Sequence, residues 1–216
     1  MPKRLTKKFH VYEILKQAII SGEIKPGEIL NEADLAQKYE TGKTPTREAL
    51  LLLTHENLLE SMPRVGYVVP RLTPRDLLEI YALRALLETE AIGLAAERIT
   101  PEEIIQLEEN NHQESKIFSQ NPARVAGLAH KLNIEFHKII ARASGNSRLE
   151  KLIENLINDL ERALSFDPYI ADPAQHMEII NSLKARDKFK AQEAMKTHLT
   201  ETRLRILNLF DSDRTD

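Results

Sequence analysis

The chain has 216 residues, of which 42% are hydrophobic and 29% are charged, a composition that supports a packed core rather than disorder. Its longest uninterrupted apolar run is Ala49–Leu53, far short of the roughly 18 residues that a membrane span needs. Cysteine is absent, which excludes disulfides, thiolate metal sites and cysteine nucleophiles. The first residues lack the apolar core of a signal peptide, so we expect a cytoplasmic protein without a membrane partner.

Three helices and a hairpin are predicted in the first 72 residues. Apolar residues at helical spacing predict a first helix over 9–21, and the turn at Lys25-Pro26-Gly27 separates it from a short helix over 32–39. Thr44-Pro45 begins a third helix that reaches about residue 59, because proline is suited to a first helical turn. β-forming residues on both sides of Gly66 predict a small hairpin within 62–70. This order of elements describes a winged helix-turn-helix.

From Thr73 onward the chain is predicted to be nearly all helix. Four N-cap residues each precede a proline, which suits the first helical position: Thr73, Thr100, Asn121 and Asp172. The predicted helices cover residues 74–97, 101–119, 122–143, 147–165, 173–185 and 188–210. Six amphipathic helices form an antiparallel bundle of ordinary domain size. The expected fold is therefore mainly α, with a winged helix-turn-helix domain over 1–72 and an all-helical domain over 73–216.

The third predicted helix begins with residue types that read DNA. Recognition helices contact base edges with their N-terminal residues, where Arg47 can pair with guanine and threonine hydroxyls can bind phosphate. The hairpin turn adds Arg64, which can enter a minor groove, and Gly66, where the backbone can approach phosphate. The candidate DNA-binding residues are Lys43, Thr44, Thr46, Arg47, Arg64 and Gly66. The alternative is a small helical domain whose basic side chains are only solvated.

Four motifs in this region resemble the DNA-binding domain of the GntR family of bacterial transcription regulators. They are the G-x-[LI]-x-P-G turn at Gly22–Gly27, the E-x-x-L-A helix at Glu32–Ala36, the T-P-x-R-E-A-L helix at Thr44–Leu50 and the P-x-x-G-x-x-V wing at Pro63–Val69. Two departures stand out. Gly42-Lys43 replaces the usual Ser-Arg, and Asn57 replaces a usual glycine. The resemblance implies binding to double-stranded operator DNA, and the departures leave the operator sequence open.

Three histidines of the C-terminal half share a common pattern, since each lies on the apolar face of a predicted helix. His137, His176 and His198 come from three separate helices. A buried histidine is commonly a satisfied core residue. Imidazole is also the commonest metal ligand, and helix bundles build metal sites from inward-facing side chains. The long spacing between the three does not decide between these interpretations.

Residues 76–210 resemble the FCD ligand-binding domain of the FadR subfamily, through "IYALRALLETEA", "FHKIIARASGN" and "QHMEIINSLKARDKFKAQEAMKTHL". Many members bind a divalent metal through an Asp-x3-His pair and two later histidines. The resemblance implies Asn133, His137, His176 and His198 as ligands for Zn, Ni or Mn. His130 lies one turn before Asn133 and could replace it, but a solvated position is the favoured interpretation for His130. An amide brings no charge, so the resemblance implies weaker metal binding than an aspartate would give.

The same resemblance implies that Arg84 receives the carboxylate of a small organic-acid effector, because a guanidinium matches a carboxylate bidentately. A surface salt bridge between Arg84 and Glu88 is the alternative.

The leading hypothesis is a ligand-responsive transcription repressor that binds a palindromic operator as a homodimer, not an enzyme. A metal-dependent enzyme using the three histidines is a rival, although the chain has no HExxH, GxSxG or phosphate loop. Two further alternatives are a metal-responsive regulator without an organic effector and a DNA-binding protein with an empty structural bundle.

Overall fold

The computed structural model describes residues 7–71, 73–118, 122–164 and 172–212, apart from the side chains of 122–127, 130, 161–164 and 209–212. The chain divides into two compact units, Met1–Arg71 and Leu72–Asp216. Each unit has its own hydrophobic core, so each is described by itself.

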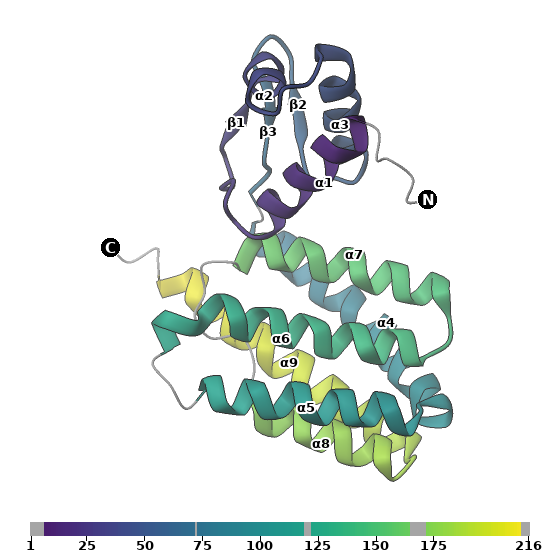
Figure 1. Ribbon diagram of the computed structural model, residues 1–216. Coiled ribbons are helices and arrows are strands. Elements are labelled where there is room, and N and C mark those ends of the chain that lie inside the picture. The colour runs from purple at the N-terminus through teal and green to yellow at the C-terminus, as the bar shows by residue number, and fades with distance from the viewer. Residues whose placement is uncertain (1–6, 72, 119–121, 165–171, 213–216) are drawn as a thin grey trace, which may run out of the picture. The chain divides into compact units, whose positions relative to one another are not determined.

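The N-terminal unit is a winged helix-turn-helix, as the sequence predicts (Figure 1). Its elements are α1 (Lys7–Ile20), β1 (Ile29–Leu30), α2 (Glu32–Lys38), α3 (Lys43–His55), β2 (Glu60–Met62) and β3 (Gly66–Val68). The three strands form an antiparallel sheet in the order β1-β3-β2, with Ser61 opposite Tyr67. Leu15, Leu50 and Leu53 are fully buried where the three helices meet.

Two differences from the prediction are larger than a shift of one or two residues at a helix end. Helix α3 ends at His55, four residues early, because Asn57 adopts a left-handed φ of 58° and the Leu58 amide turns back to the Leu53 carbonyl. This is a Schellman end, and asparagine can replace the usual glycine there. Strand β1 was not predicted, since two residues are too short for an alternating pattern.

Gly66 has a structural reason to be glycine. Its φ of +141° is one that other residues rarely adopt, and a Cβ there would lie 2.4 Å from the Leu30 carbonyl oxygen. The close approach between β3 and β1 therefore requires the missing side chain. This role is independent of the predicted DNA contact.

The C-terminal unit contains six helices among the described residues, as predicted. They are α4 (Pro74–Arg98), α5 (Pro101–Phe118), α6 (Pro122–Ala143), α7 (Ser147–Leu164), α8 (Pro173–Lys184) and α9 (Lys188–Ser212). Helix α4 packs along α9, and α5 lies against α6 and α8 (Figure 1). The core lies between these helices, with Phe136 its largest fully buried side chain.

The predicted caps explain the boundaries of these helices. Thr73 and Asp76 form a reciprocal capping box, as do Thr100 and Glu103. Asp172 accepts a hydrogen bond from the Ala174 amide at the start of α8. The predicted cap Asn121 and the predicted last residues 119 and 165 lie outside the described residues.

Candidate metal centre and DNA-binding surface

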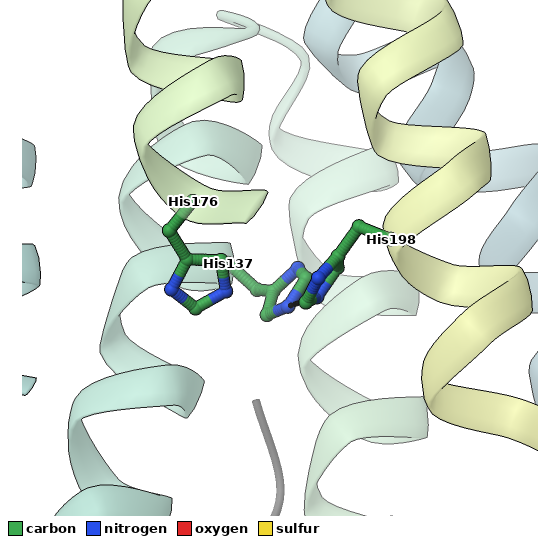
Figure 2. Close-up of side chains that lie close together, drawn as sticks. All are labelled: His137, His176 and His198. Atoms are coloured by element: carbon green, nitrogen blue, oxygen red, sulfur yellow. Dashed lines mark hydrogen bonds between the residues drawn. The ribbon is translucent and has the colours of Figure 1, made fainter. Parts of the chain in front are cut away.

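His137, His176 and His198 converge in the interior of the C-terminal unit. They come from α6, α8 and α9, and at most 1% of each residue is exposed. One ligand nitrogen from each lies within 4.8 Å of the other two, and the rings face one another (Figure 2). Among the described residues no other group of three metal-ligating side chains gathers in this way.

The packing of each helix turns its histidine inward. His137 follows the buried Phe136 on α6, and His198 lies between the buried Met195 and Leu199 on α9. The His176 ring stacks on the Phe136 ring, with 3.9 Å between centroids and 10° between planes. The apolar pattern that buries these helix faces therefore also brings the three imidazoles together.

The outer nitrogen of each imidazole has a hydrogen-bond partner. Nδ1 of His137 lies 2.5 Å from Glu88 Oε2, and Nδ1 of His176 lies 2.6 Å from Glu114 Oε2. Nδ1 of His198 lies 2.9 Å from Gln175 Oε1. All three partners are oxygen acceptors, so each Nδ1 carries the proton and each Nε2 presents a lone pair.

Those lone pairs fit a metal ion. Nε2 of His137 and Nε2 of His198 lie 3.2 Å apart, and two acceptors cannot hydrogen-bond to each other. Nε2 of His176 is buried without a hydrogen-bond partner. Buried unpaired acceptors cost free energy, and a divalent cation would satisfy all three at once.

Burial also holds two histidines in the form that binds metal. Desolvation lowers the pKa of His137 despite the neighbouring Glu88 carboxylate. Desolvation, together with the His176 and His137 rings, holds the pKa of His198 well below its usual value. Only the neutral imidazole can ligate, so both rings are ready to accept a metal at neutral pH.

Asn133 lies one turn before His137 on α6, and the residue is 7% exposed. Its Oδ1 is buried and has no hydrogen-bond partner. An unpaired amide oxygen on the same helix face as a candidate ligand fits the predicted role of a fourth donor. His130 lies in α6 as well, but its side chain is outside the described residues.

Arg84 forms a salt bridge with Glu88, which was the alternative to effector binding in the sequence analysis. The pair is buried, however, and not on the surface. Arg84 Nε lies 2.5 Å from Glu88 Oε1, and the two side chains are 5% and 3% exposed. Burial raises the pKa of Glu88, but Arg84 and His137 outweigh it and bring that pKa to about 2. Glu88 is therefore a carboxylate that joins Arg84 to the first histidine.

The sequence interpretation missed Glu114 and Gln175 and did not connect Glu88 with the histidines. One signal was present for Glu114. Its helix, α5, buries a polar stripe of Asn110, Asn111 and Glu114 between Leu107 and Ile117. Polar residues at inward-facing helical positions need partners, so they indicate a polar centre.

The predicted DNA-binding residues lie on α3 and the hairpin, with one correction. Lys43, Thr44 and Arg47 are exposed near the start of α3, and Arg64 is exposed at the turn between β2 and β3. Thr46 is fully buried, and its hydroxyl contacts Thr41 Oγ1 and the Gly42 carbonyl. The prediction that Thr46 contacts DNA therefore does not fit the structure, because its hydroxyl forms hydrogen bonds within the turn between α2 and α3 instead.

A winged helix-turn-helix followed by an all-helical domain with a buried polar centre is typical of DNA-binding regulators that carry a ligand-binding domain. The model named "Bacterial regulatory proteins, gntR family" matches residues 7–69, and the FCD domain model matches residues 79–201. The chain belongs to the GntR family and carries an FCD domain.

Relatives match this chain over most of its length. The uncharacterized HTH-type transcriptional regulator YdhC of Bacillus subtilis (strain 168) is 31% identical, over 87% of this chain and 85% of YdhC. The HTH-type transcriptional repressor RspR of Escherichia coli (strain K12) is 27% identical, over 88% of this chain and 85% of RspR. The structure of E. coli McbR/YncC is 27% identical and superposes with a TM-score of 0.77, over 95% of this chain and 98% of McbR.

This family consists of transcription regulators, so the chain is a DNA-binding regulator and the metal-dependent enzyme interpretation is wrong. The FCD domain implies a small-molecule effector. No helix in the described part of the chain has the length and apolar character to cross a membrane.

The buried salt bridge predicts a large loss of stability in Arg84→Ala, because Glu88 keeps its buried charge and loses its cation. We expect a loss of roughly 3–5 kcal/mol in the free energy of unfolding of the C-terminal unit. Arg75→Ala is the matched control, since Arg75 forms an exposed pair with Glu79 at the same helical spacing on α4. That change should cost little or no stability, because an exposed ion pair is screened by solvent. Urea unfolding followed by circular dichroism measures both, and equal losses would contradict the buried pairing.

Proposed function

We propose that the chain is a transcription repressor that binds a palindromic operator as a homodimer and is released by a small carboxylate, with a divalent metal in the FCD domain. The convergence of three buried histidine nitrogens beside the Arg84–Glu88 pair carries this proposal. A cation bound by these nitrogens would belong to the same buried polar network as the Arg84 guanidinium, because Glu88 contacts both His137 and Arg84. The repressor role rests on relatives such as RspR, which is named a transcriptional repressor.

The DNA-binding surface is the exposed start of α3 together with the hairpin turn. Lys43 and Arg47 offer positive side chains to base edges and phosphates, and Thr44 offers a hydroxyl. Arg64 and Gly66 at the hairpin are the candidate wing contacts. One helix-turn-helix reads only a few base pairs, so two copies on a two-fold operator are needed for specificity.

The metal ligands are His137, His176 and His198, with the amide oxygen of Asn133 as a weaker fourth. Zn, Ni and Mn are the candidate ions, of which Zn and Ni suit imidazole ligands best, and the chain offers no thiolate. When bound, the metal supplies a positive charge that attracts an anionic effector. Arg84 contacts Glu88 through Nε and also contacts Tyr81, and the remaining N–H groups of its guanidinium are the candidate donors to a carboxylate.

The DNA prediction concerns Arg47 and Lys43. Arg47→Ala should weaken operator binding by about 1–3 kcal/mol, because a guanidinium paired with a base edge contributes that much. Lys43→Ala should weaken binding to all sequences and flatten its salt dependence. Fluorescence anisotropy with an operator selected from random DNA measures both. Lys190→Ala, which removes an exposed charge from the C-terminal unit, is the control. Unchanged operator affinity in Arg47→Ala would refute the assignment.

The metal prediction is that the protein, when it is purified without a chelator, contains close to one divalent ion per chain. Metal at 100 times its dissociation constant should stabilise the C-terminal unit by about 2.7 kcal/mol, since it binds only the folded state. His176→Ala should abolish the gain, and the exposed His112→Ala should keep it. Asn133→Asp should tighten binding through its charge. Elemental analysis and thermal unfolding measure these effects. No metal in the wild type or in Asn133→Asp, with Zn²⁺, Ni²⁺ and Mn²⁺ added, would make the histidines a polar core.

The effector prediction is that a small carboxylate releases the metal-loaded protein from its operator. Arg84→Lys keeps the buried charge but not the planar fork, so it should need at least about tenfold more carboxylate for release. A panel of small mono- and dicarboxylates in the anisotropy assay tests this. Release by the metal alone, with no response to any carboxylate, would favour the metal-responsive alternative. Equal response of the wild type and Arg84→Lys would assign the carboxylate to another residue.

A further inference from the structure

We infer that Glu114 is a positioning residue for the metal centre. Its carboxylate orients the His176 ring toward the other two histidines and supplies the negative charge that Asn133 lacks. This inference rests on the proposed metal site. It concerns α5, a helix that contributes no ligand of its own. Glu114 is 3% exposed, and its Oε2 lies 2.6 Å from His176 Nδ1.

Two contacts fix the His176 ring. Phe136 stacks against its face, and Glu114 holds its Nδ1 edge. With Nδ1–H donated to the carboxylate, the ring has only one tautomer, in which the Nε2 lone pair faces His137 and His198 (Figure 2). Carboxylates in this position orient ligating histidines and increase their basicity, and their loss typically weakens metal binding 10- to 100-fold.

The charge of Glu114 is not neutralised in the way that the charge of Glu88 is. Arg84 pairs with Glu88, so that pair contributes almost no net charge to the centre. Within the described residues, no lysine or arginine forms an ion pair with Glu114, whose one partner is His176. Glu114 is therefore the carboxylate that can offset the charge of a bound cation.

Asn133 makes this charge important. Three imidazoles and an amide are all neutral donors, so they leave the full charge of a divalent ion uncompensated. A carboxylate that is hydrogen-bonded to a ligating histidine offsets part of that charge through the imidazole ring. If this is the function of Glu114, then moving the negative charge from Glu114 to residue 133 should preserve metal affinity.

The experiment measures Zn²⁺ affinity of the full chain by competition with a chromophoric chelator. Glu114→Gln keeps the size of the side chain and removes the charge, so we expect 10- to 100-fold weaker binding. Glu109→Gln makes the same change at an exposed position on α5 and should bind as the wild type does. Glu114→Gln combined with Asn133→Asp should recover most of the lost affinity. Affinity within twofold of the wild type in Glu114→Gln would overturn the inference.

A second measurement needs no substitution and so does not depend on the folding of a variant. Long-range ¹H–¹⁵N spectra of the metal-free wild type report the tautomer of each histidine ring, and we expect His176 to be protonated at Nδ1 alone. Protonation at Nε2 instead would overturn the inference. Failure of the metal site itself has a different signature, because the wild type would then bind no Zn²⁺ in the competition assay.

Discussion

The C-terminal unit is built around three buried imidazoles, and each has an outer nitrogen with a hydrogen-bond partner and an inner nitrogen that faces the other two histidines. The outer nitrogens face Glu88, Glu114 and Gln175, which come from α4, α5 and α8. The inner nitrogens face one another from α6, α8 and α9. Five of the six helices are thus held by one polar centre, and their apolar faces pack around it. An unpaired polar atom at this depth costs about 1–3 kcal/mol, so a shift of any one of these helices would be expensive.

Glu88 connects the two functions proposed for this centre, since one carboxylate oxygen contacts Arg84 and the other contacts His137. A ligand that draws on the Arg84 guanidinium changes the field at Glu88, and Glu88 sets the basicity of a metal ligand. In the proposed function, carboxylate binding and metal binding would therefore be coupled through this one side chain. Such coupling is reciprocal, so an effector that prefers the metal-loaded state must also tighten the metal.

Helix boundaries were predictable because they depend on local chemistry. N-cap residues followed by proline mark the starts of α4 and α8, and the structure has both where the sequence predicts them. The inward direction of the three histidines was also predictable, because helical periodicity alone determines it. Thr46 was misassigned because a threonine in a first turn suits both DNA contact and local hydrogen bonding. Its distance to Thr41 depends on how the turn folds, which periodicity does not describe.

The partners of the histidines could not be found in the same way. Glu114 lies 62 residues from His176, and only the packing of α5 on α8 brings them together. Their pairing is a tertiary fact, although the buried polar stripe on α5 indicated that some partner had to exist. The salt bridge of Arg84 shows the opposite case. The spacing of Arg84 to Glu88 was visible in the sequence. The burial of the pair was not, although burial decides how much the pair contributes to stability.

The charges of the polar centre also bear on which ligand suits it. Arg84 pairs with Glu88, Asn133 carries no charge, and Glu114 forms its ion pair with His176 rather than with a lysine or arginine of the described residues. The Arg205 cation adds positive potential at His198. A divalent ion would therefore make the buried centre more positive, and a bound carboxylate would offset that charge. Because a net charge in a low-dielectric interior is costly, neutrality is the most stable condition of the loaded domain. An aspartate at position 133 would offset more of the charge of the metal by itself. In the proposed site, the asparagine would therefore favour an anionic ligand as the partner of the metal.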